Sequence, residues 1–187
     1  MADNIITPEF RAGFISIFKA TQQKNDDGTL SAPKFSVRAC FPPDSDFDAM
    51  VEQVNRVVKD KFGDQPPKNW RKPFRKNEEL DKPVQGIGDD WVIMTFSANE
   101  DRRPGIVDAK LQDIIDSSEV YSGAWYRAQV RAFWYEKKGN KGVSFGLQNV
   151  QKLRNDDPLG GSNIPASKAF DAVPTEGGSK TAGGMFD

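Results

Sequence analysis

The chain has 187 residues, of which 37% are hydrophobic and 28% charged, a composition typical of a soluble domain with its own core. It contains no histidine and one cysteine, which excludes intrachain disulfides, Cys/His zinc sites and histidine-dependent catalysis. No apolar run approaches the ~18 residues of a membrane span, and the N-terminal residues lack a secretory-signal pattern, so we expect a cytoplasmic protein.

Two strands and a helix are predicted in the first third of the chain. Residues 10–20 form a short apolar run suited to a strand, and residues 35–41 alternate apolar with polar side chains, which indicates a second strand. Over residues 46–62 apolar residues recur at three- and four-residue spacing, which predicts an amphipathic helix packed on a sheet. Ser45 and Asp48 resemble a capping pair at its start.

Three more strands are predicted in the remainder. Residues 64–90, rich in Pro, Gly and charge, indicate a long loop, and residues 91–98 a third strand. Residues 99–124 give no clear pattern because Pro, Gly and Ser interrupt some helical spacing. Residues 125–135 and 143–153 are the last two strands, and the lysine- and glycine-rich linker between them predicts a hairpin.

These elements predict a mainly β fold: a five-stranded OB-fold-like barrel with one amphipathic helix and long loops, with a β-sandwich as the main alternative. We expect this domain to span residues 1–153. Residues 154–187, with six glycines and three prolines, are expected to be a disordered, Gly-rich C-terminal tail. The tail holds three basic and five acidic residues, which leaves 23 basic and 22 acidic residues in the domain. Any binding of a polyanion therefore depends on local clusters of charge.

Residues 125–135 divide into two faces when they are interpreted as a strand, because side chains alternate along a strand. One face is small or apolar, and the other combines arginines with aromatics. Such a face indicates a surface that stacks bases and neutralises phosphates. In the alternative, Phe133 and Tyr135 join the core through a bulge and the arginines are merely solvated. The candidate DNA-binding residues of this hairpin are Arg127, Arg131, Phe133, Tyr135, Lys137, Lys138 and Lys141.

A second candidate segment, residues 68–76, places five positive charges and two aromatics in a loop. The aromatics either meet a ligand or fold back onto the body of the domain. Arg38, Arg102 and Arg103 are weaker candidates. Arg102 and Arg103 can line a groove or bracket a turn, and the turn is the favoured interpretation. The candidate DNA-binding residues of the second segment are Trp70, Arg71, Lys72, Phe74, Arg75 and Lys76.

Four stretches, residues 121–128 (YSGAWYRA), 138–152 (KGNKGVSFGLQNVQK), 158–161 (PLGG) and 104–108 (PGIVD), resemble a family of OB-fold single-stranded DNA-binding proteins of tailed bacteriophages and prophages, formerly an uncharacterised family. The resemblance covers about residues 10–161. It implies coating of single-stranded DNA without sequence specificity during phage DNA replication and recombination, in the cytoplasm of the bacterial host. It also implies a C-terminal tail that can modulate binding or recruit replication or recombination proteins.

Carboxylates are plentiful, but their spacing shows no metal-binding motif, so we predict a non-enzymatic protein without a metal or other cofactor. Two alternatives are a protein-interaction or virion-associated β-barrel module and a carboxylate-metal nuclease. Self-association into a homo-oligomer is compatible with any of these.

Overall fold

The computed structural model describes residues 3–159, 170 and 173. Most of the regular structure in this part is β, with one α-helix, α1 (Asp48–Phe62), and two short 3-10 turns at Asn77–Glu79 and Ser117–Glu119. The strands are β1 (Ile5–Ile6), β2 (Phe10–Thr21), β3 (Lys34–Phe41), β4 (Arg75–Lys76), β5 (Val92–Asn99), β6 (Gly105–Val107), β7 (Trp125–Lys137) and β8 (Asn140–Arg154).

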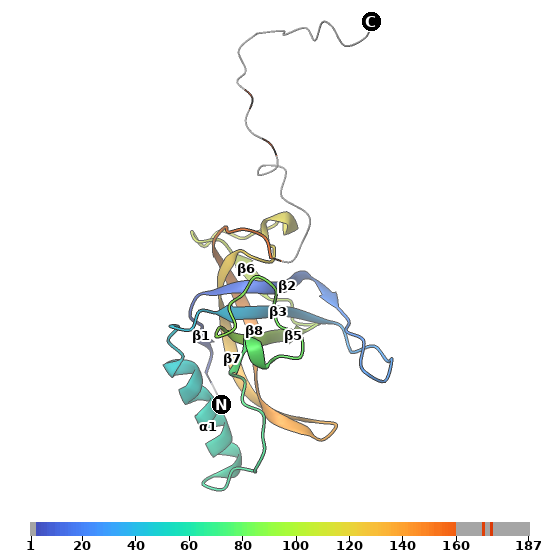
Figure 1. The fold of residues 1–187 in the computed structure, drawn as a ribbon, viewed down its shortest axis with the longest axis vertical. Helices are drawn as coiled ribbons and strands as arrows, with labels where there is room; N and C mark the ends of the chain where they lie inside the picture. Colours follow the sequence, from blue (N-terminus) through green and yellow to red (C-terminus); the bar gives the residue numbers. More distant parts are fainter. Residues whose placement is uncertain (1–2, 160–169, 171–172, 174–187) are drawn as a thin grey trace, which may run out of the picture.

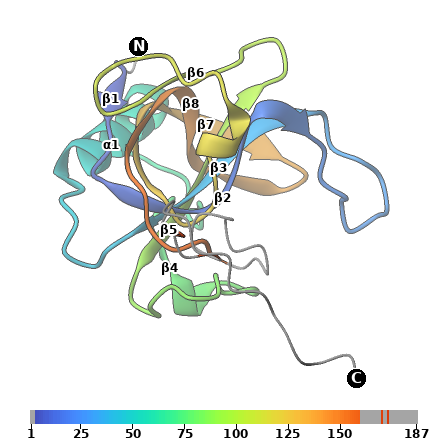
Figure 2. The same ribbon diagram turned by 90° about the horizontal axis from the view of Figure 1, so that it is seen from above.

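The five long strands close into a ring (Figures 1 and 2). Strand β2 pairs with β3, β3 with β5, β5 with β8, β8 with β7, and β7 with β2. All these pairings are antiparallel except β5–β8, which is parallel. The short strands β1, β4 and β6 add to β7, β5 and β8. This OB-fold-like ring with one helix confirms the predicted fold class.

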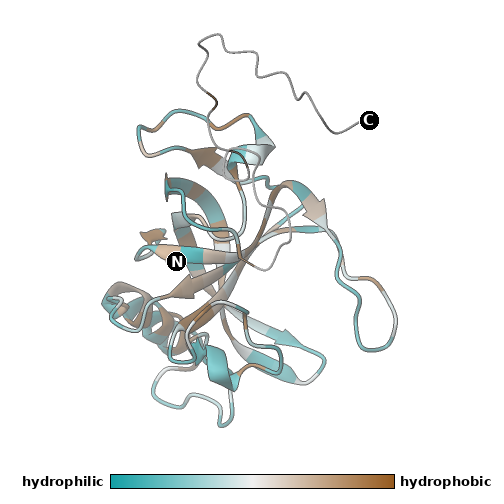
Figure 3. Cartoon of the chain, turned by 45° about the horizontal axis from the view of Figure 1, so that its top comes forward, coloured by the Kyte–Doolittle hydropathy of each residue, from teal (hydrophilic) through white to brown (hydrophobic). Residues whose placement is uncertain are grey.

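The core lies inside the ring and is rich in aromatic side chains. The rings of Phe10 and Phe41 meet edge to face at 5.4 Å, and Phe96 meets Phe145 in the same way at 6.0 Å. Helix α1 covers one end of the ring with an apolar stripe that includes Met50. Figure 3 shows hydrophobic colour along the inner strands and hydrophilic colour on the outer helix face and much of the loops.

The ends of α1 agree only partly with the sequence prediction. Phe47 occupies the N-cap position without a side-chain cap, and the Asp46 carboxylate accepts the N–H of Asp48 at 2.9 Å. The predicted Ser45–Asp48 capping pair is therefore wrong: the side chain that accepts a backbone N–H here comes from Asp46. No helix within the described residues is long and apolar enough to cross a membrane.

Two segments that showed no strand pattern carry short strands. The predicted loop 64–90 contains β4, and the unassigned stretch 99–124 contains β6, which pairs in parallel with β8. The first residues of the predicted tail also contact the domain: Arg154 forms an ion pair with Glu9 at 2.9 Å, and Leu159 packs near Ile87. Residues 160–169, 171–172 and 174–187, most of the predicted tail, lie outside the described residues, and the domain boundary stays a prediction.

The N-terminal segment lies along β7. Ile5 and Ile6 pair with Val130 and Gln129, and the N–H of Thr7 donates to the Ala128 carbonyl at 2.9 Å. Buried Gln53 of α1 secures the same region, because its amide donates to the carbonyl of Asp3 and accepts the N–H of Ala132. The edge of β7 is thereby covered by the chain's own N-terminus.

A cover formed by residues 77–91 lies over part of the outer sheet face. Asn77, 1% exposed, organises it by donating to the carbonyls of Val84 and Ile87 and accepting the N–H of Val84 at 2.7 Å. Ile87 packs with Cys40 and Ile93, which come from the outer faces of β3 and β5. The cover therefore closes the Cys40 end of this outer face and leaves the other end open.

Candidate nucleic-acid interface

The aromatic and basic face of β7 points outward, over small residues of β8. Phe133 pairs with Ser144, Arg131 with Gly146 and Tyr135 with Gly142. Phe133 is 43% exposed and does not enter the core through a bulge. The two register shifts of the β7–β8 ladder fall between Trp125 and Tyr126 and between Gln129 and Val130, before this stretch. The small partners Ser144 and Gly146 on β8 leave room beside Phe133 and Arg131, whereas the space above Gly142 is taken by the backbone of Arg71.

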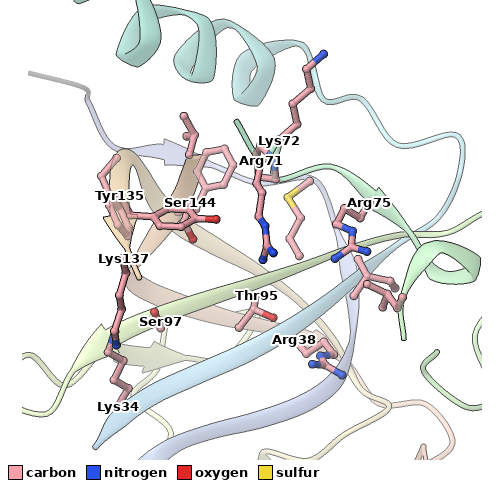
Figure 4. A pocket seen from close by; sticks show the side chains of 17 residues that line it. Lys34, Arg38, Arg71, Lys72, Arg75, Thr95, Ser97, Tyr135, Lys137 and Ser144 are labelled. Atoms are coloured by element: carbon pink, nitrogen blue, oxygen red, sulfur yellow. The ribbon is translucent and has the colours of Figure 1, made fainter. Parts of the chain in front are cut away.

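A cavity of about 540 Å³ opens beside this face. Its floor includes Thr95 and Ser97 of β5, and its walls come from β3, from the β7–β8 hairpin and from the segment before and within β4 (Figure 4). In Figure 4 the Arg71 side chain points into the cavity, and Lys34 and Lys137 point toward one another at one side. Six basic residues line this cavity and no acidic ones do: Lys34, Arg38, Arg71, Lys72, Arg75 and Lys137.

A second cavity of about 490 Å³ continues from the first. The two share Lys34, Ser97 and Phe133, so these three residues mark their junction. The second cavity adds three basic residues and again no acidic one. We call the two cavities together the basic groove; its nine basic residues are Lys34, Arg38, Arg71, Lys72, Arg75, Arg102, Arg103, Arg131 and Lys137.

The positive charge of the basic groove is not neutralised from within the part of the chain that the structure describes, since none of the nine cations forms an ion pair there. Neutral groups hold several of them in place. Arg131 donates to the Asn4 side chain at 3.1 Å, Arg75 donates to the Glu79 carbonyl at 2.7 Å, and the Arg103 guanidinium lies 5.2 Å from the Phe18 ring centre. A chain with 26 basic and 27 acidic residues thus concentrates positive charge on one surface.

The segment that carries Arg71, which forms one wall of the groove, is hydrogen-bonded to the β7–β8 hairpin through the backbone. The Arg71 N–H donates to the Lys141 carbonyl at 2.8 Å, and the Val143 N–H donates to the Arg71 carbonyl at 3.2 Å. Gly142 allows this approach, because a Cβ at that position would overlap the Arg71 carbonyl. The wall is therefore held in position, and the Arg71 side chain with it.

The structure brings seven of the thirteen predicted residues to the basic groove. These seven residues are Arg71, Lys72, Arg75, Arg131, Phe133, Tyr135 and Lys137. Six others do not line it: Trp70, Phe74, Lys76, Arg127, Lys138 and Lys141.

Trp70 and Phe74 take the fold-back alternative. Trp70 packs against Trp134 at 6.0 Å between ring centres, and Phe74 lies 5.7 Å from Phe47 and 6.5 Å from Phe145. They help to fix the groove wall from behind instead of facing it. Arg127 lies near the start of β7, away from the groove, and donates to the Gln151 side chain at 2.6 Å.

The thirteen predicted residues leave out four basic residues that line the groove: Lys34, Arg38, Arg102 and Arg103. Strand periodicity places Lys34 and Arg38 opposite the buried side chains of β3, where the structure has them, but does not show that this face belongs to the site. Arg102 and Arg103, for which a turn was the favoured interpretation, line the second cavity. Their sequence neighbourhood does not decide between a groove and a turn, because the pairing of β5 and β6 with β8 brings them to the groove.

Comparison with known proteins places the chain in a family. Residues 3–179 match the family model described as Enterobacter phage Enc34, ssDNA-binding protein. The chain belongs to this Enc34 ssDNA-binding family. The resemblance inferred from sequence motifs is thereby confirmed. A curated relative, protein p50 of Acyrthosiphon pisum secondary endosymbiont phage 1, is 31% identical over 77 residues, which is 41% of each chain. The match thus spans about two fifths of that relative's length.

Solved structures share the fold of this Enc34 family member. The single-stranded DNA-binding protein from bacteriophage Enc34 in complex with ssDNA aligns with a TM-score of 0.64 at 20% identity, over 84% of this chain and 89% of that one. The single-stranded DNA-binding protein gp2.5 of bacteriophage T7 aligns with a TM-score of 0.56 at 13% identity, over 97% and 100% of the two chains. At these identities the likeness concerns the fold.

Proposed function

We propose that this protein binds single-stranded DNA in the basic groove without sequence preference. The observation that carries the proposal is the lining of the groove, which has nine basic residues and no acidic one. Membership of the Enc34 ssDNA-binding family supports it. So does the position of the groove, since OB-folds bind oligonucleotides on the face of their second and third strands, which correspond to β3 and β5 here.

In the proposed complex the cations follow the phosphates. Binding of a phosphate chain releases its condensed counterions, so affinity falls steeply as salt rises, with a slope that reports the number of neutralised phosphates. Arg38, Arg71 and Arg75 line the first cavity, and Arg102 and Arg103 line the second. A strand that passes through both cavities meets positive charge along its whole path.

In the proposed complex the bases stack on aromatic rings and pack against the small side chains that form the floor of the first cavity. Phe133 exposes 43% of its surface at the junction of the cavities, and Tyr135 lines the first cavity. Every base has a flat face, so stacking tolerates any sequence. Thr95, Ser97 and Ser144 of the floor offer hydroxyl groups that donate to or accept from either base edges or phosphates.

The role that follows is coating of single-stranded DNA during phage replication and recombination, in the cytoplasm of the host and without catalysis. Among the described residues, no group of three or more carboxylates and thiols is arranged to hold a metal ion. Replication or recombination proteins are the partners that such a role requires. The C-terminal tail, most of which lies outside the described residues, is the segment we propose for their recruitment.

Fluorescence anisotropy with a labelled oligo-dT tests the proposal. Affinity should fall linearly with salt on logarithmic axes, and Arg38→Ala should reduce the slope by ~0.7 for each phosphate that Arg38 neutralises in the wild-type complex. Lys59→Ala is the matched control, because Lys59 is exposed on α1 outside the groove and should leave the slope unchanged. Absence of binding at low salt with micromolar wild-type protein would refute the function.

A further inference from the structure

The tips of two loops meet on one side of the molecule. The β2–β3 loop and the β7–β8 hairpin project on the same side in Figures 1 and 2. The Lys138 ammonium at the hairpin tip lies 3.4 Å from the Asp27 carboxylate at the loop tip. Both side chains are exposed, Lys138 by 68% and Asp27 by 52%. We call this ion pair the clasp.

Asp27 is held ready for this contact by its own turn. Its carboxylate accepts the N–H of Thr29 at 3.0 Å and the Thr29 hydroxyl at 2.5 Å, and Gly28 has a φ of 82°. These hydrogen bonds keep the pKa of Asp27 below its ordinary value, so the carboxylate is charged at neutral pH. On the other side, Lys138 and Gly139 form a two-residue hairpin turn with φ values of 50° and 79°.

The clasp completes a closed ring of contacts through the strands that line the junction of the two cavities. From β3 the ring crosses to β5 by the Ser36–Ser97 pair and to β8 by the Ser97–Gly146 pair. It crosses to β7 through the long β7–β8 ladder and runs along the hairpin to its tip. The clasp then leads to the β2–β3 loop, and the covalent chain returns to β3 at Lys34.

Residues at the junction come from the strands of this ring. Lys34 of β3, Ser97 of β5 and Phe133 of β7 each line both cavities. A strand that occupies both cavities must therefore pass this junction. Every link of the surrounding ring is covalent or a backbone pairing except the clasp, which is a solvent-exposed ion pair and hence a weak contact.

We propose that Asp27 and Lys138 are positioning residues that enclose the bound strand: single-stranded DNA passes between the cavities through the ring, and the clasp opens to admit it sideways. This inference rests on the proposed binding of single-stranded DNA in the basic groove. It explains why an acidic side chain stands beside the basic surface, where it would otherwise only repel phosphate. It also explains how a ring of fixed strands can load onto DNA that has no free end.

A covalent clasp tests the inference. The variant Asp27→Cys/Lys138→Cys is bridged by a short bifunctional methanethiosulfonate reagent, which a reductant removes. Association is then measured with linear 60-nucleotide oligo-dT and with the same oligonucleotide ligated into a circle. The bridged protein should bind the linear form by threading and should associate with the circle at least ten-fold more slowly than the unbridged protein. Reductant should restore association with the circle.

Three controls distinguish an effect of bridging the clasp from nonspecific modification and from a failure of DNA binding itself. Cys40, the native cysteine, is fully buried and should not react with the reagent. The same variant treated with a monofunctional reagent controls for modification of the tips. Failure of the wild-type protein to bind linear oligo-dT would refute the proposed function and not the clasp specifically.

Two results would overturn the enclosure itself. One is equal association of the bridged protein with circle and linear DNA, since the strand then does not pass through the ring. The other is an equal decrease for both forms, since the bridged tips then occlude the groove. If the first variant fails to fold, Asp26→Cys/Lys138→Cys, one residue along the loop, provides a second one. When either variant is bridged after it has bound the circle, the protein should stay on the circle at high salt.

Discussion

Replacement of Phe133 by alanine tests the stacking part of the proposed interface most directly. The ring stands at the junction of the two cavities and is 43% exposed. Its partner across the ladder is Ser144, and Arg131, two residues along β7, pairs with Gly146. No neighbouring large side chain on β8 faces this position from the opposite strand, so truncation leaves nothing to take the place of the ring.

The expected weakening follows from one stacked base. Base–aromatic stacking contributes about 1–3 kcal/mol by alanine substitution. At about 1.4 kcal/mol per tenfold change, Phe133→Ala should weaken binding of oligo-dT by roughly 5- to 140-fold. The salt dependence should keep its slope, because no charge is removed. Stability should fall by much less than the ~3–5 kcal/mol typical of a buried phenylalanine, because Phe133 is partly exposed.

Anisotropy titrations at several salt concentrations measure affinity and slope together, and urea denaturation measures stability. Ile115→Ala is the matched control, since Ile115 is 88% exposed and lies outside both cavities. An unchanged affinity for Phe133→Ala in a protein that still unfolds cooperatively would show that no base stacks there. A changed slope would show that the truncation disturbed the cations of the groove instead.

Three further predictions concern the elements that support the groove. Gly142→Ala should cost about 1–3 kcal/mol in urea denaturation by overlap with the Arg71 carbonyl, whereas Gly146→Ala, whose Cβ meets nothing closer than 3.7 Å, should be tolerated. Asn77→Ala should cost about 1–3 kcal/mol by leaving the buried Ile87 carbonyl and the partly buried backbone groups of Val84 without their partner, and exposed Asn55→Ala should cost little. Burial raises the pKa of the Cys40 thiol from 9.0 to about 12, so Ellman's reagent should not react with the native protein at pH 8. The folded state keeps this proton to higher pH than the unfolded state does. The Cys40 contribution to stability should therefore be present below pH 9 and be lost as the pH rises toward about 12. A thiol that titrates near pH 9 in the native protein would contradict this.

The predictable parts of this protein depend on local periodicity. Alternation along residues 125–135 places Tyr126 and Val130 inside and Phe133 outside, as the structure has them, because the strand geometry itself separates the faces. The apolar stripe of α1 is equally clear in the sequence. Both signals belong to single elements and need no knowledge of what the element packs against.

The parts that sequence reasoning missed depend on contacts between distant segments. Whether Trp70 and Phe74 face outward is decided by Trp134, Phe47 and Phe145, which arrive from three other elements. Arg102 and Arg103 reach the groove only because β5 and β6 both pair in parallel with β8. The basic lining of the groove is therefore a property of the assembled sheet and not of any one stretch of sequence.

The N-terminal segment along β7 has a consequence for behaviour at high density. A strand edge with open N–H and C=O groups is a template for pairing with another chain, which leads to aggregation. Here β1 and Thr7 occupy that edge of β7. A protein that gathers in many copies along one DNA strand brings identical edges close together at high local concentration. The covered edge lets copies crowd without their sheets joining, so removal of residues 3–7 should favour aggregates.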